Sequence, residues 1–203
     1  MHEFNRPASR ARVARTIAAL RANQIDAELA PSPAAARARV LELIPDGAEV
    51  LCATSRTIEK LGLLEDLEQS GRYAAVRPAY LKLDRKADAA QIRRMRSAPE
   101  FVVGSVHAVT DSGQVVIASQ TGSQLSAYVY GAGRVIWVVG TQKLVTDLDE
   151  AMRRIEEHAL PLEEARSQLA YKIGSGINKV VVVNAEFRPG RTNLIFVPAR
   201  IGF

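Results

Sequence analysis

The chain has 203 residues, of which 47% are hydrophobic and 24% are charged, and its formal net charge is +5. This composition indicates one globular domain with a core of ordinary size, and it argues against an intrinsically disordered chain. No apolar run approaches the roughly 20 residues that a membrane-spanning helix needs. The basic N-terminus lacks the apolar segment and cleavage site of a signal peptide, so we expect a cytoplasmic protein with no membrane partner.

The positive charge comes from arginines that are spread along helical stretches among many alanines. No tract of about five basic residues occurs, and aromatic residues are few. We therefore expect solvated helix faces and no nucleic-acid partner. Binding of DNA or RNA through these arginines is the alternative.

The sequence contains no ligand set for a metal or a cofactor. Cys52, the single cysteine, lies in the apolar run 50–53 and is expected to be a buried structural thiol. His2, His107 and His158 lack the spacing of metal ligands. We therefore predict no metal site, no iron–sulfur cluster and no bound cofactor.

Helices and strands alternate through the first half of the chain. The expected elements are, in chain order, a helix over 9–29, a helix over 34–43, a strand over 48–53, a helix over 58–69, an extended run over 74–83 and a basic helix over 87–96. Pro33 suits the first turn of the second helix, because its fixed φ is helical and no N–H is needed there. The turn after the first strand is rich in hydroxyl groups and leads directly into a helix.

The second half is richer in strands. The expected elements are strands over 101–103, 115–118 and 135–139, a helix opening near Thr146, a further helical stretch to 171, and strands over 179–184 and 192–198. This alternation predicts an α/β domain with a largely parallel sheet. The turns at 111–113 and 189–190 each fit a local hairpin, so we expect a mixed sheet with antiparallel additions.

Three polar turns follow expected strands. They contain Thr54, Ser55, Arg56 and Thr57; Thr121, Gly122, Ser123 and Gln124; and Gly140 with Lys143. Because the carboxyl ends of parallel strands share one edge, we expect the turns to meet in one crevice. The second turn leads into a helix, whose first N–H groups can bind an anion, and Arg56 and Lys143 would add positive charge. This predicts a pocket for a carboxylate, a phosphate or a nucleotide; in the alternative, the glycines only let the chain turn and both cations are solvated.

A fourth turn carries an acidic residue, Asp111, between Thr110 and Ser112, with Gly113 following. The aspartate can accept backbone N–H bonds and so hold the turn, which is its more frequent role. Alternatively, it is a base or a nucleophile beside the pocket. We expect this turn to converge with the other three, and Thr110, Ser112 and Gly113 to contribute to ligand binding.

The middle of the chain carries a family resemblance. Residues 104–155, GSVHAVTDSGQVVIASQTGSQLSAYVYGAGRVIWVVGTQKLVTDLDEAMRRI, resemble the core of the LUD domain of the lactate utilization proteins. Residues 49–64, with the turn TSRT, and residues 177–203 resemble the small, single-domain branch of that family. The resemblance implies an α/β/α sandwich similar to the ribose-phosphate isomerase, glucosamine-phosphate deaminase and CoA transferase superfamily. Residues 48–203 would form this domain, with residues 1–47 as a helical segment packed on it.

The resemblance also implies a function. We expect an accessory or ligand-binding component of L-lactate oxidation to pyruvate that acts with iron–sulfur partner proteins, because this chain has no cluster ligands of its own. The alternative is a stand-alone enzyme that acts on a small anion, such as a sugar phosphate, a CoA ester or a folate-like molecule, with Asp111 as acid or base. A homodimer through the final strand, at 193–197, is a further expectation.

Overall fold

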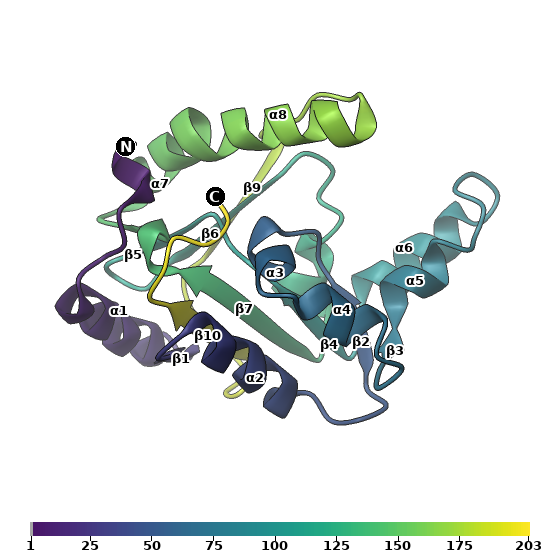
Figure 1. Cartoon of the computed structure of the whole chain (residues 1–203), viewed down its shortest axis with the longest axis horizontal. Helices are drawn as coiled ribbons and strands as arrows, with labels where there is room; N and C mark the ends of the chain where they lie inside the picture. Colours follow the sequence, from purple (N-terminus) through teal and green to yellow (C-terminus); the bar gives the residue numbers. More distant parts are fainter. Residues whose placement is uncertain (1) are drawn as a thin grey trace.

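The computed structural model describes residues 2–203, and its strands form two sheets (Figure 1). The larger sheet has six strands, and every pair of neighbours in it is parallel. In spatial order these strands are β1 (Asp26–Leu29), β10 (Thr192–Val197), β7 (Arg134–Gly140), β4 (Phe101–Gly104), β2 (Glu49–Cys52) and β3 (Ala74–Ala75). The predicted α/β fold with a mostly parallel sheet is confirmed.

The antiparallel additions form a second sheet and do not extend the first. In spatial order its four strands are β8 (Leu144–Val145), β5 (Ala108–Thr110), β6 (Val115–Ser119) and β9 (Lys179–Val183). The strands β5 and β6 make an antiparallel hairpin around the turn at 111–113, as predicted. The strand β8 joins β5 in parallel, and β9 joins β6 in antiparallel orientation.

Helical segments connect and cover the strands. They are η1 (Glu3–Asn5), α1 (Arg10–Ala22), α2 (Pro33–Leu43), α3 (Arg56–Lys60), α4 (Leu63–Glu68), α5 (Val76–Tyr80), α6 (Ala89–Ser97), η2 (Ala127–Gly131), η3 (Thr141–Lys143), α7 (Leu148–Arg154), η4 (Ile155–Ala159) and α8 (Leu160–Tyr171). Ser9 and Ser32 cap α1 and α2 by accepting backbone N–H bonds, as such residues do at helix starts. Asp147 caps α7 in the same way, and the hydroxyl group of Thr146 donates to Glu150. None of the helices among residues 2–203 has the length and apolar character that crossing a membrane requires.

The core lies on both faces of the larger sheet. On the β7 strand, Trp137 packs into one apolar cluster, whereas Ile136 and Val138 pack into another. The second cluster lies under α2, α3 and α4, which cover the near face in Figure 1. The first cluster joins the larger sheet to the smaller sheet and α1, and α7 covers the outer face of the smaller sheet. The result is an α/β/α sandwich in which helices enclose two sheets.

The first predicted helix divides into a helix and a strand. The helix α1 ends at Ala22, and the chain reverses at Gln24, whose φ is +59°. Ile25 is fully buried beyond this reversal, and β1 then pairs with β10. Tertiary pairing therefore overrides the helical spacing of the apolar residues. The extended run expected at 74–83 likewise contains only the two residues of β3 before α5 begins.

Two expectations about the last strand are wrong. The strand β10 lies between β1 and β7, so it has no free edge through which a homodimer could form at 193–197. The turn at 189–190 is not a hairpin turn, because β9 pairs in the smaller sheet and β10 in the larger one. That turn carries the chain from one sheet to the other.

Candidate functional site

A cavity of about 280 Å³ lies at the carboxyl ends of β2 and β4. The segments that follow these strands, 53–57 and 105–107, form two of its walls. The end of β6 adds a third wall, because the hairpin opens at Ala108, next to the end of β4. Residues of α5, α6, η2, η4 and α8, the segment 175–177 and Phe203 close the remaining sides.

The cavity brings together residues from the three turns that were expected to meet. These lining residues are Thr54, Ser55, Arg56, Thr57, Thr121, Ser123, Gln124 and Lys143. Ligand binding by these residues stays a prediction. Gly122 and Gly140 lie in the same turns but outside the cavity lining. The φ of Gly122 is +81°, a conformation that favours glycine. A Cβ at Gly140 would lie 2.1 Å from the Gln142 Oε1 atom, so both glycines serve the path of the chain.

The helical stretch expected after the second turn is present but short. It runs from residue 125 to residue 131, and its last five residues form the π-helix η2. The helix therefore begins just beyond Thr121 and Gly122. So few aligned peptide dipoles provide little positive potential. An anion would therefore have to be held by side chains.

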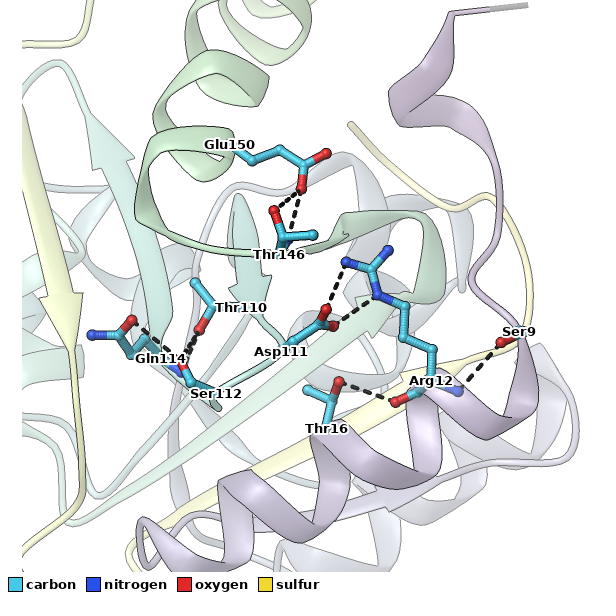
Figure 2. A network of polar contacts seen from close by, with 9 residues as sticks. All are labelled: Ser9, Arg12, Thr16, Thr110, Asp111, Ser112, Gln114, Thr146 and Glu150. Carbon is cyan, nitrogen blue, oxygen red and sulfur yellow. Dashed lines mark hydrogen bonds and ion pairs between the residues drawn. The ribbon is translucent and has the colours of Figure 1, made fainter.

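The fourth turn, at 111–113, lies outside the cavity lining. Its predicted residues Thr110, Asp111, Ser112 and Gly113 are at the closed end of the β5–β6 hairpin, one strand length from the cavity. Figure 2 shows Asp111 facing Arg12 of α1, which donates to it from Nε at 2.7 Å and from Nη2 at 3.2 Å. The expected convergence of all four turns is therefore wrong, because a hairpin separates its turn from its open ends.

Lys143 is the most deeply buried cation of the cavity lining. Its side chain is only 2% exposed, although the sequence left open a solvated position. The Nζ atom donates to the Val106 carbonyl oxygen at 2.9 Å, to Ser105 Oγ at 3.1 Å and to Thr57 Oγ1 at 3.4 Å. No carboxylate of residues 2–203 forms an ion pair with it. Burial, and then the charge of Arg154, lower the pKa of Lys143 well below its ordinary value.

Three arginines also line the cavity, and two of them have carboxylate partners. Arg56 forms an ion pair with Glu59, and Arg166 binds Glu163 through two hydrogen bonds of 2.6 and 2.7 Å. Arg96 differs, because its guanidinium lies over the Tyr80 ring and its buried Nε has no hydrogen-bond partner among the described residues. Arginines of this helix were expected to lie on a solvated face, so the position of Arg96 in the cavity lining was missed.

His107 and Arg154 lie next to Lys143. The Nδ1 atom of His107 accepts the Ala118 N–H at 3.1 Å, which leaves Nε2 as the protonated nitrogen of a neutral ring. Burial, with the charges of Lys143 and Arg154, lowers the pKa of His107 to about 3. Arg154 is fully buried and donates to the His107 carbonyl oxygen at 2.6 Å, while its Nε and Nη2 have no partner among the described residues.

Comparison with known proteins identifies the family. The sequence model of the LUD domain matches residues 13–197. The chain belongs to the LUD domain family. No curated protein matches this LUD-family chain in sequence. Among solved structures, the chain is similar to the crystal structure of a DUF162 family protein from Deinococcus radiodurans, with a TM-score of 0.55 and 12% identity, covering 94% of this chain and 99% of that one. At this level of identity the likeness supports the fold.

Two properties limit the chemistry of this LUD domain. Cys52 is buried, as predicted, and burial raises the pKa of its thiol, so the thiolate that reacts with electrophiles and metals is disfavoured. No group of three or more His, Cys, Asp or Glu residues within 2–203 has an arrangement that could hold a metal ion.

The LUD cavity combines a buried amine, an unpaired guanidinium, a neutral imidazole and several hydroxyl groups. Such a set can bind an anion and donate hydrogen bonds to it. His107 and Ser105 were missed as cavity residues, although they follow β4 in the way that the predicted turns follow their strands. The rule that ligands collect at strand ends would have found both residues.

Proposed function

We propose that this LUD-family chain is a cytoplasmic ligand-binding component of lactate utilization, and that it holds a small organic anion in the cavity. In this role it acts with iron–sulfur partner proteins in the oxidation of L-lactate to pyruvate. The observation that supports anion binding is Lys143, a buried cation on the cavity wall with no carboxylate partner among the described residues.

A buried charge without a counter-ion is costly, because the protein interior solvates it poorly. The hydrogen bonds of Lys143 to hydroxyl and carbonyl oxygens offset part of that cost but supply no opposite charge. A bound anion would supply it. The volume of about 280 Å³ lies at the lower end of small-molecule sites, which favours a compact metabolite over a nucleotide or an intact CoA ester.

Calorimetric titration with small anions tests the binding proposal. The wild-type protein and the Lys143→Met variant are titrated with L-lactate, pyruvate, malonate and inorganic phosphate, and exposed Lys86→Met serves as the control. We expect at least one anion to bind the wild type and the control, and the Lys143 variant to lose about tenfold or more in affinity. Equal affinity in all three proteins would remove Lys143 from the site, and absence of any binding would refute the proposal.

The partner proposal needs a cellular test. A deletion strain should grow poorly on L-lactate as the carbon source, and the wild-type gene should restore growth. The tagged protein should also co-purify with proteins that contain iron–sulfur clusters. Normal growth of the deletion strain, with no such partner recovered, would contradict a role in lactate oxidation.

An enzymatic role is the second candidate. It is favoured by the placement of the Lys143 amine, the His107 ring and the Ser105 hydroxyl along one cavity wall, where proton donors and acceptors meet. The purified chain alone, incubated with sugar phosphates, CoA esters or folates, would then change the NMR spectrum of one of these compounds. Spectra that stay unchanged under conditions where an anion binds would contradict the enzymatic role and leave ligand binding as the remaining candidate.

A further inference from the structure

The cavity is lined by more positively charged side chains than negatively charged ones. Four cations line it, Arg56, Arg96, Lys143 and Arg166, and two carboxylates, Glu59 and Glu163, face them. The two carboxylates are both used, by Arg56 and by Arg166 respectively. Lys143 and Arg96 therefore remain without an opposite charge among the described residues.

The two unbalanced cations come from different parts of the fold. Lys143 lies in η3, after β7, whereas Arg96 lies in the last turn of α6. The donors of Lys143 are directed to neutral oxygens, and the Arg96 Nε is buried without a partner. Both residues line the same cavity, from two different walls.

Arg154 adds positive potential from behind the wall. It is fully buried, it donates a hydrogen bond to the His107 carbonyl oxygen, and none of its nitrogen atoms has a carboxylate partner among residues 2–203. Its charge acts on Lys143, because after burial it is the second cause that lowers the pKa of the amine. A bound anion would offset this charge and favour the protonated lysine. No acidic side chain of the described residues forms an ion pair with Arg154.

We infer that the ligand of this cavity carries two negative charges, as a phosphate monoester or a dicarboxylate does. The inference rests on the proposed function, because it names the class of anion that the same cavity would hold. A monocarboxylate such as lactate would neutralise one cation and leave the other buried and unpaired. A dianion neutralises both, and a phosphoryl or carboxylate oxygen matches the planar donor fork of Arg96.

Titration of matched anions tests this inference. The probes are malonate and inorganic phosphate as dianions, and acetate and pyruvate as monoanions, at one pH and one ionic strength. The proteins are the wild type, Arg96→Gln, Arg96→Lys, and Arg93→Gln, which changes an exposed arginine on the same helix. Melting temperatures of the variants show whether each one is folded.

We expect the wild type to bind one dianion at least about tenfold more tightly than either monoanion, the change that one charge-assisted contact produces. In Arg96→Gln this preference should fall to about threefold or less, whereas Arg96→Lys and Arg93→Gln should keep it. Tighter binding of malonate indicates a dicarboxylate, and tighter binding of phosphate indicates a phosphate ester.

Other outcomes overturn the inference. Monoanions that bind the wild type as tightly as dianions would refute it while leaving the proposed anion site intact. A preference for dianions that survives in folded Arg96→Gln would also refute it, because the second charge would then have another source. If no probe binds at all, both the inference and the proposed anion site fail.

Discussion

Arg12 holds Asp111 through two hydrogen bonds, from Nε to Oδ1 at 2.7 Å and from Nη2 to Oδ2 at 3.2 Å. The pair fastens α1 to the closed end of the β5–β6 hairpin, as Figure 2 shows. Asn23, at the end of α1, also donates to the carbonyl oxygens of Ser112 and Gly113. Asp111 therefore ties its turn to α1 through the Arg12 side chain, whereas Thr110 Oγ1 accepts the backbone N–H of Gln114 within the turn.

Asp111→Asn should leave anion binding unchanged, because the side chain lies outside the cavity lining. The stability loss should be below about 1 kcal/mol, since the side chains of Arg12 and Asp111 are 27% and 43% exposed and water screens the pair. Urea unfolding and calorimetric titration measure the two effects. A large loss of affinity in a folded variant would give Asp111 a role in the site.

Lys143→Ala and Lys143→Met should differ in stability. The alanine variant leaves a void and three oxygen atoms without their donor, so we expect it to lose about 2–3 kcal/mol. The methionine variant fills the space and removes a buried charge, so it should lose at most about 1 kcal/mol. Urea unfolding of both variants checks this. Equal losses would show that the hydrogen bonds, and not the buried volume, control the stability at this site.

Gly104→Ala should disturb the cavity wall. A Cβ at Gly104 would lie 1.9 Å from the Tyr128 hydroxyl oxygen and 3.1 Å from the Ala53 Cβ. We expect a loss of roughly 2–3 kcal/mol from overpacking, and partial recovery when Tyr128→Phe removes the oxygen atom. The double variant compared with each single variant in thermal unfolding measures this coupling. Additive losses would contradict the predicted contact.

Stability should decrease as the pH falls below about 6.5, because the pKa of His107 is about 3 in the folded protein and that of an unfolded histidine is about 6.5. The unfolded chain takes up a proton in this interval while folded His107 does not. The contribution of His107 to the free energy of unfolding is thus complete above pH 6.5 and is lost progressively toward pH 3. Between pH 6.5 and pH 5 we expect a loss of about 1–2 kcal/mol from this residue.

His107→Asn is the matching variant, since the amide oxygen can accept the Ala118 N–H in place of Nδ1. Unfolding free energies measured from pH 7 to pH 5 should fall less steeply in this variant than in the wild type. Equal slopes would show that His107 has the same pKa in the folded and the unfolded protein, and would contradict the prediction.

The centre of the larger sheet could be predicted from the sequence because its central strands contain continuous apolar runs. The run at 135–139 is an example, since both faces of β7 are buried in the core. The three polar turns could be located for the same reason, because each follows such a strand. The edge strand β1 was missed, because four residues carry little periodic signal and the pairing partner, β10, lies far away in the sequence.

The errors at the site have geometric causes. The turn at 111–113 was correctly assigned to a hairpin, and that assignment already implies that it lies at the opposite end of β6 from the turn at 121–124. The role of Arg96 could not be deduced, because α6 presents one arginine to the cavity and Arg93 and Arg94 to solvent, and only the packing decides which. The burial of Lys143 likewise depends on Thr57, Ser105 and Val106, which are distant in sequence.

An anomalous difference map from crystals soaked in selenate is the most direct measurement of the central claim. Selenate is a compact dianion with an anomalous scatterer, and the proposal places it in the cavity within hydrogen-bond distance of Lys143 or Arg96. The predicted result is a peak there that disappears in crystals of the Lys143→Met variant. Peaks confined to exposed arginines, with the cavity free of selenate, would contradict the account.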